Sequence, residues 1–192
     1  ASNTLHDMTL NAGDGAYLSG LSASAFGIGN FNMHLGTIDN SGTINATATN
    51  SMSNVALTAE NKATLDDIKA LAQGIANGAD ITGLTNSGSI TAIAADTYTD
   101  LSLNANDNSG AAYLYCGIAT AYGINNYGSG TLTELDNSGD ILADAGASYS
   151  NVEFVAAGGD GAFIYSTITA QGIFNDSGAP ISGDLTNSGN IE

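Results

Sequence analysis

Apolar and small polar residues alternate along most of this chain. The alternation is clearest in 43–49 (TINATAT), 101–105 (LSLNA), 112–124 (AYLYCGIATAYGI) and 161–173 (GAFIYSTITAQGI). A period of two places successive side chains on opposite faces, and the frequent β-branched and aromatic residues favour extended backbone. The pattern therefore predicts an all-β fold.

One segment, 62–78 (KATLDDIKALAQGIANG), has helical spacing instead, with Leu65 and Ile68 beginning an apolar face. Taken alone, this spacing predicts a helix. However, residues 8–28 align without a gap on residues 55–75, and 8–28 are rich in Gly, Ser and aromatic residues. Because the two segments should follow the same backbone path, we expect 62–78 to be a strand.

The chain repeats itself with a period of about 48 residues, which is typical of stacked repeat architectures. The triplet Asn-Ser-Gly recurs with its glycine at Gly42, Gly88, Gly139 and Gly189. The motif Ala-x-Gly-Ile-x-Asn recurs with its glycine at Gly27, Gly74, Gly123 and Gly172. An apolar residue follows the triplet glycine by fifteen positions at Leu57, Leu103 and Phe154.

We expect the recurring motifs at the corners of a coil. Asn and Gly tolerate left-handed backbone conformations, and stacked Asn side chains can hydrogen-bond from one coil to the next. The predicted structural corners are Asn40, Gly42, Asn86, Gly88, Asn137, Gly139, Asn187 and Gly189.

Together these features predict a parallel β-helix (β-solenoid) that forms a single domain over residues 1–192. A propeller is disfavoured because the chain has no tryptophan, and a single proline leaves nearly every backbone N–H available to a ladder. At about 24 residues per coil, each repeat would supply two coils and the chain about eight, with three smaller coils per repeat as the alternative. The four repeats span approximately 1–42, 43–88, 89–139 and 140–189, followed by the start of another.

The charge of the chain limits its partners. Nineteen acidic residues outnumber two lysines, and the formal net charge is −17. Surfaces that contact phosphate need positive charge, so we expect no binding to nucleic acid or anionic lipid. No apolar run approaches the roughly 20 residues of a membrane-spanning helix, so we also expect no membrane insertion.

Three Asp residues precede the aromatic strands at equivalent points: Asp14, Asp107 and Asp160. If they stack, they could form a ladder that binds structural calcium, and no other cofactor is expected. The nonapeptide of calcium-binding β-rolls is not completed, because Phe163 stands where its second aspartate belongs. Ordinary Asp-Gly turns are therefore the competing interpretation.

Other candidates for chemistry have simpler interpretations. Cys116 alternates with bulky residues and is expected to be a small core side chain. His6 and His34 lie in unrelated phases of the repeat and are not expected to share a metal. Asp66 and Asp67 are adjacent, so on a strand they would point to opposite faces and make a poor acid–base pair. We expect that the chain is not an enzyme.

Aromatic residues recur at equivalent places, at Tyr17, Tyr113 and Phe163. We interpret them as a stack inside the core, which is common where aromatic residues align on neighbouring strands. The alternative is an outward strip that grips a glycan or another partner.

The string Gly-Ile-x-Asn, followed by Leu-Thr-Asn-Ser-Gly-x-Ile-x-Ala-x-Ala, resembles the repeats in β-helical passenger regions of bacterial autotransporters and related outer-surface adhesins. The resemblance covers essentially the whole chain. It implies a right-handed parallel β-helix that is extracellular or displayed on the cell surface of a Gram-negative bacterium.

Two function classes follow. The first is an extracellular structural repeat protein that forms or extends a surface fibre by head-to-tail stacking. The second is an autotransporter-type adhesin passenger fragment that binds a host, glycan or neighbouring cell surface. We expect the first, with a homopolymer of the chain itself as the main partner.

The sequence shows no capping element at either end, so either a longer parent chain continues the coil or identical subunits stack. When two copies are set end to end, Gly189 lies thirteen positions before Leu10 of the next copy, close to the fifteen found within the chain. Leu10 and Ile191 are therefore the predicted assembly ends.

Overall fold

The computed structural model describes residues 1–107, 110–157 and 161–192. All strand pairs in these ranges are parallel. The described residues contain no helix that could span a membrane. In chain order the strands are β1 (Ser2–Asn11), β2 (Gly15–Ser19), β3 (Ser22–Asn30), β4 (Leu35–Asn40), β5 (Thr43–Ala59), β6 (Lys62–Asn77), β7 (Ile81–Asn86), β8 (Ser89–Ala105), β9 (Ala111–Asn126), β10 (Leu135–Asn137), β11 (Asp140–Ala156), β12 (Ala162–Asn175), β13 (Leu185–Asn187) and β14 (Asn190–Ile191).

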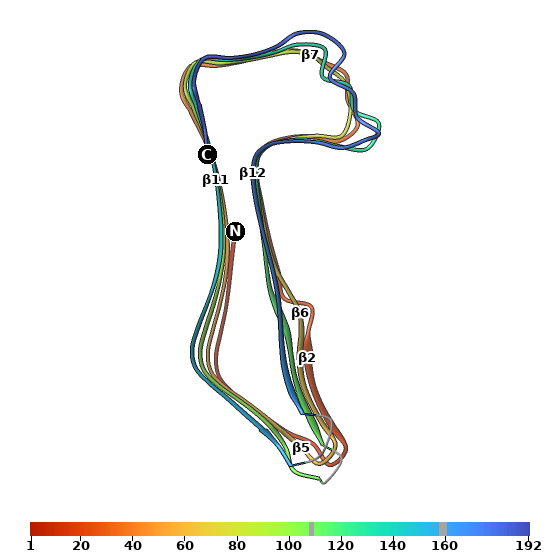
Figure 1. Ribbon diagram of the computed structural model, residues 1–192, viewed down its shortest axis with the longest axis vertical. Coiled ribbons are helices and arrows are strands. Elements are labelled where there is room, and N and C mark those ends of the chain that lie inside the picture. Colours follow the sequence, from red (N-terminus) through yellow and green to blue (C-terminus); the bar gives the residue numbers. More distant parts are fainter. Residues whose placement is uncertain (108–109, 158–160) are drawn as a thin grey trace.

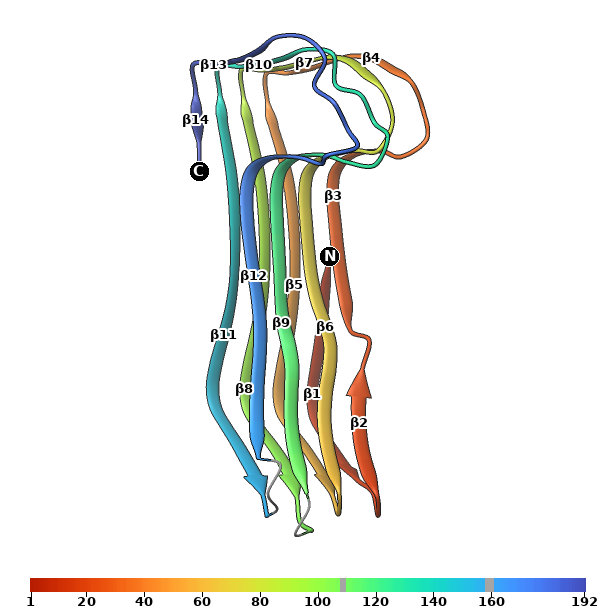
Figure 2. The ribbon, with the colours of Figure 1, turned by 45° about the vertical axis from the view of Figure 1, so that its right-hand side comes forward.

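The strands form three parallel sheets, and each repeat contributes to all three. Sheet A has the order β1-β5-β8-β11-β14, sheet B has the order β12-β9-β6-β2 with β3 also pairing with β6, and sheet C has the order β13-β10-β7-β4. Figure 2 shows the long strands of successive repeats side by side. Viewed along the stack, successive repeats superimpose as layers of one closed path (Figure 1). The all-β fold of stacked parallel strands is compatible with a β-solenoid.

Neighbouring strands in a sheet are one whole repeat apart. Ser2 pairs with Thr49, and Ser89 pairs with Asp140. Each repeat therefore makes one layer, and the prediction of two coils per repeat is wrong, as is the alternative of three. The reason is strand length: β5 has 17 residues and β6 has 16, so the two long sides of one circuit use most of a repeat. At a layer spacing of about 4.8 Å, four layers are roughly 20 Å high.

The segment with helical spacing is strand β6, as predicted. Leu18 pairs with Leu65, in the register of the gapless alignment. Leu65 and Ile68 are both fully buried although they are three positions apart, because a bulge at Asp67 (φ 56°) shifts the register between them. An irregularity of the strand, and not a helix, therefore produces the helical spacing.

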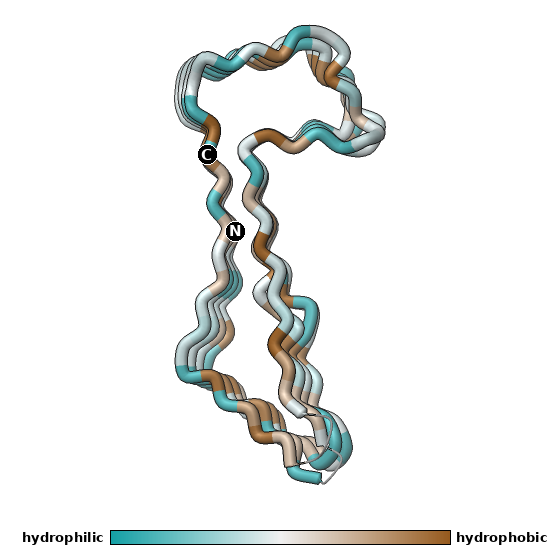
Figure 3. The backbone as a smooth tube through the Cα atoms, in the orientation of Figure 1, coloured by the Kyte–Doolittle hydropathy of each residue, from teal (hydrophilic) through white to brown (hydrophobic). Residues whose placement is uncertain are grey.

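The core lies between sheets A and B and extends under sheet C. Leu57, Leu103 and Leu114 belong to a large cluster near one end of the long strands. The middle contains only alanine among its buried apolar residues, including Ala48 and Ala94, and here the two long sides of the circuit run close together (Figure 1). A third cluster of Ile and Leu residues lies under sheet C. Hydrophobic positions coincide from layer to layer (Figure 3).

Candidate functional site

The asparagines of the Asn-Ser-Gly triplets form a ladder that runs through the stack. Nδ2 of Asn40 donates to Oδ1 of Asn86 (2.7 Å). Asn86 donates in the same way to Asn137 (2.7 Å), and Asn137 donates to Asn187 (2.7 Å). Asn86 and Asn137 are fully buried. Each inner amide therefore accepts from the layer before and donates to the layer after.

A second ladder comes from the last residue of the Ala-x-Gly-Ile-x-Asn motif. Asn30 donates to Asn77 (2.8 Å), Asn77 donates to Asn126 (2.7 Å), and Asn126 donates to Asn175 (2.7 Å). This ladder has the same polarity as the first. The two ladders hold the corners on either side of sheet C.

The glycines of the triplets are required by close packing between layers. The prediction that these glycines adopt a left-handed conformation is wrong, because their φ angles lie outside that region. A Cβ atom on Gly88 would lie 2.0 Å from the carbonyl oxygen of Gly42, and one on Gly139 would lie 2.0 Å from that of Gly88. On Gly42, in the first layer, a Cβ atom would meet nothing within 4 Å.

The glycines of the second motif make room for the isoleucines that follow the triplets. A Cβ atom on Gly74 would lie 2.4 Å from Cγ2 of Ile90, and one on Gly123 would lie 2.3 Å from Cγ2 of Ile141. The isoleucine of one motif thus packs on the glycine of the other, across the two long sides of the circuit. This contact explains why both motifs recur together.

Left-handed residues occur at a corner that the sequence reading missed. Asp7, Asn54, Asp100 and Asn151 have φ angles of 54°, 53°, 55° and 52°. Nδ2 of Asn54 donates to Asp7 (2.6 Å), and Nδ2 of Asn151 donates to Asp100 (2.9 Å). The available signal was an Asp or Asn three positions before the recurring apolar residue in every repeat.

Carboxylates are separated from one another along the stack. Asp39 pairs with Thr85, which pairs with Asp136, which pairs with Thr186. Oγ1 of Thr186 donates to Asp136 (2.6 Å). In the register of the described strands, no carboxylate residue pairs with another. Alternate layers are about 10 Å apart, close to the screening length in physiological salt, so this spacing limits repulsion in a chain of charge −17.

One carboxyl group lies inside the core. Asp96 is 1% exposed, its Oδ1 accepts from Nδ2 of Asn50 (2.9 Å), and its Oδ2 has no hydrogen-bond partner. Burial raises the pKa of Asp96 to about 6, and the bond from Asn50 opposes the shift. The sequence reading missed this residue, although Asn3 and Asn50 precede it at the same phase.

Cys116 is a buried free cysteine, as predicted. Burial raises its pKa to about 12, so the thiol stays protonated and unreactive at neutral pH. Nearby, the ring of Tyr98 stacks on Tyr149 with centroids 5.0 Å apart, and the Tyr98 hydroxyl oxygen accepts from the amide of Gly117 (2.8 Å). These groups form a polar seam within the large cluster.

The aromatic residues expected in the core lie on the outer face of sheet B. Tyr17 is 57% exposed and Phe163 is 52% exposed. The core prediction is wrong because Ala16 and Leu18 occupy the inward positions, which leaves the residue between them outside. Tyr113 stacks on Phe163 with centroids 5.6 Å apart.

A shallow depression of about 360 Å³ lies beside these rings. It is lined by Asp66, Asp67, Lys69, Tyr115, Ile118 and Tyr165. The expectation that Asp66 and Asp67 point to opposite faces is wrong, because the bulge at Asp67 leaves both exposed and both at the depression. Lys69 forms an ion pair with Asp67.

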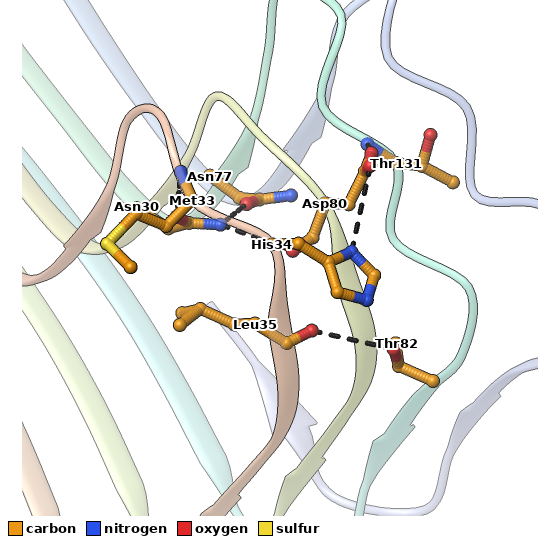
Figure 4. A network of polar contacts seen from close by, with 8 residues as sticks. All are labelled: Asn30, Met33, His34, Leu35, Asn77, Asp80, Thr82 and Thr131. Carbon is orange, nitrogen blue, oxygen red and sulfur yellow. Dashed lines mark hydrogen bonds and ion pairs between the residues drawn. The ribbon is translucent and has the colours of Figure 1, made fainter.

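The two histidines are far apart in sequence and have separate acidic neighbours. Nδ1 of His6 lies 3.0 Å from Asp7. Nδ1 of His34 lies 3.8 Å from Asp80, whose other oxygen accepts from the amide of Thr131 (3.2 Å). Figure 4 shows this network in the loops that lead to sheet C, next to Asn30 and Asn77 of the second ladder.

The predicted calcium residues do not form a metal cluster in the described part of the chain. Asp14 accepts a hydrogen bond from Nδ2 of Asn61 in the next layer. The amide of Asp107 donates to the carbonyl of Glu60 (2.8 Å), and Asp160 lies outside the described residues. Within the described ranges, no three His, Cys, Asp or Glu side chains are placed to hold a metal. Ordinary Asp-Gly turns and structural calcium stay the two interpretations of these residues.

The predicted assembly ends lie in the two end layers. Leu10 pairs with Leu57 and packs against the large cluster in the first layer. Ile191 pairs with Ile141 in the last layer and is 40% exposed.

Comparison of the chain with protein-family models, with curated proteins and with solved structures gave no match.

Proposed function

We propose that this chain is an extracellular structural repeat protein whose β-solenoid subunits stack head to tail into a surface fibre. The resemblance of its repeats to autotransporter passenger regions supports the location, on the surface of a Gram-negative bacterium. The proposal depends mainly on one observation, the uncovered apolar columns of the last layer.

Three apolar columns that are buried in the inner layers reach solvent in the last layer. Ile164, Leu185 and Ile191 are 54%, 51% and 40% exposed. Their register partners Leu114, Leu135 and Ile141 are at most 1% exposed. Another layer of the same shape would bury these side chains and pair the open strand edges of β12 and β13, which otherwise favour association.

The amide ladders give the stack a direction. On the last layer they end in the Nδ2 groups of Asn175 and Asn187, and on the first layer they begin with the Oδ1 atoms of Asn30 and Asn40. Head-to-tail stacking would bring donors to acceptors and continue both ladders. Head-to-head stacking would oppose like groups, so neither ladder could continue from one subunit to the next. A head-to-tail contact of this kind does not close and generates a filament.

Gly42→Ala tests the proposal. Its new methyl meets nothing within 4 Å in the isolated chain, but the same methyl in an inner layer would overlap the carbonyl of the layer before. We expect this variant to fold normally and to lose filaments in sedimentation and electron microscopy. Gly13→Ala is the control, because it adds a methyl in the first layer that also meets nothing within 4 Å, and it should assemble like the unmodified chain.

Two results would count against stacking. One is an unmodified chain that stays monomeric at high concentration. The other is a Gly42→Ala variant that forms filaments as readily as Gly13→Ala.

A second candidate function, recognition of a surface through one face of the molecule, is favoured by the exposed aromatic residues on sheet B. These rings lie on the outer face of sheet B, outside the core, and are available to a partner.

A further inference from the structure

We propose that the depression beside Tyr115 and Tyr165 binds a cationic side chain, an ammonium or guanidinium group carried by a basic peptide segment of a partner protein. The inference rests on the second candidate function, recognition through one face, and it does not depend on stacking.

A cation–aromatic contact of this kind is already present next to the depression, on the same outer face of sheet B. Nζ of Lys62 lies 4.8 Å from the ring centroid of Tyr113 and 5.7 Å from that of Tyr17. Both distances are within the range of a cation–π interaction. The outer aromatic rows of sheet B are therefore spaced to hold a cation between rings of different layers, and in this row the chain supplies the cation itself.

The neighbouring row has the rings but a different set of charges. Tyr115 pairs with Asp66 in the layer before and with Tyr165 in the layer after. The rings of Tyr115 and Tyr165 have centroids 6.5 Å apart and are tilted by 49°. The stacked rings of Tyr113 and Phe163, in contrast, are nearly parallel at 10°. A tilted pair leaves ring surface open to a ligand, and the two tyrosines are 38% and 58% exposed.

Charge in the depression favours a cation. Asp67 already has Lys69 as its ion-pair partner, whereas the ion pairs of the described residues give Asp66 no cation. Oδ1 of Asp66 accepts from the amide of Asp67 (2.7 Å), which fixes the orientation of the carboxylate at the bulge. A ligand cation between Asp66 and the two rings would gain a charge-assisted contact and a cation–π contact together. The net charge of −17 would also attract a basic segment from a distance.

The experiment measures binding of a capped tetralysine peptide by calorimetry in about 150 mM salt, where long-range attraction is screened. Tyr165→Leu should weaken binding about three- to tenfold, because it keeps an apolar side chain but removes the ring. Tyr165→Phe should retain most of the affinity, because the ring remains. Phe26→Leu, which removes an exposed ring outside the depression, should have no effect.

A charge-matched pair separates the site from the field of the whole molecule. Asp66→Asn and Asp39→Asn each remove one exposed carboxylate, and only Asp66→Asn should weaken binding by a similar factor. Equal losses in the two variants, or equal losses in Tyr165→Leu and Phe26→Leu, would overturn the site. So would the absence of peptide binding, or binding of a neutral oligosaccharide such as cellohexaose in place of the peptide.

Discussion

Asn50 donates a hydrogen bond to the buried carboxyl group of Asp96 over 2.9 Å, and the second oxygen of that carboxyl group has no partner. The two residues continue a column that begins with Asn3, whose amide donates to Asn50 (3.0 Å). An asparagine ladder in sheet A therefore ends in an acid. This arrangement makes the stability of the stack dependent on pH.

Asp96→Asn should stabilise the protein at neutral pH. The pKa of Asp96 is raised to about 6 from 3.8. Its neutral form is thus favoured by folding, and the corresponding stability is present below about pH 4 and lost as the pH rises through 6. A shift of about two pKa units corresponds to about 2 to 3 kcal/mol as an upper bound. Denaturation between pH 4 and 8 should show the variant gaining over the unmodified chain as the pH rises, with the difference disappearing near pH 4.

Asp144→Asn is the control for this prediction. It removes an exposed carboxylate from β11, the sheet A strand that pairs with the Asp96 strand β8. It should change stability by less than about 0.5 kcal/mol. An equal gain in both variants would show that net charge, and not the buried carboxyl group, governs the pH dependence.

Asn86→Ala should destabilise the stack by about 2 to 4 kcal/mol. The change removes a fully buried amide. Nδ2 of Asn40 then keeps only its bond to the carbonyl of Ser89, and Oδ1 of Asn137 loses its donor. Asn187→Ala, at the exposed end of the same ladder, should cost less than about 1 kcal/mol in the monomer. Urea denaturation of both variants measures the difference, and similar costs would contradict a cooperative ladder.

Gly139→Ala should strongly destabilise the protein. Its methyl would lie 2.0 Å from the carbonyl oxygen of Gly88, so two layers must move apart at a cost of about 3 kcal/mol or more. Gly146→Ala lies in β11, the strand that follows Gly139, and its methyl meets nothing within 4 Å, so it should leave the melting temperature nearly unchanged. If circular dichroism melting gives the two variants the same midpoint, close contact between layers does not explain the recurring glycine.

Removal of calcium should have little effect on stability. Asp14 accepts a hydrogen bond from Asn61, and this bond needs no bound metal ion. Melting followed in the presence and absence of a chelator should give the same midpoint. A fall of many degrees with the chelator would instead establish structural calcium.

Repetition in the sequence was sufficient to predict much of this fold. The alignment of residues 8–28 on 55–75 gave the register of β2 and β3 on β6, and it overruled the helical spacing of Leu65 and Ile68. The recurring Asn residues also led to the expectation of stacked amides, and two ladders of them are present.

The number of residues in one turn of the coil could not be predicted from the repetition. A 48-residue period fixes which residues are equivalent, but not how many turns the chain makes between them. The deciding feature is the alanine cluster around Ala48 and Ala94, which allows two long strands to pack closely in one narrow layer. The outer position of Tyr17 and the shared face of Asp66 and Asp67 depend on strand phase and on a single bulge, which no repeat pattern reveals.

The most direct measurement of head-to-tail stacking is the subunit repeat along the filament axis, determined by helical reconstruction from electron micrographs. One layer per repeat and four repeats per chain predict a polar filament with a rise of about 19 Å per subunit, at about 4.8 Å per layer. A rise of about 38 Å per asymmetric unit, as two coils per repeat or head-to-head pairs would give, or the absence of any polymer, would contradict it.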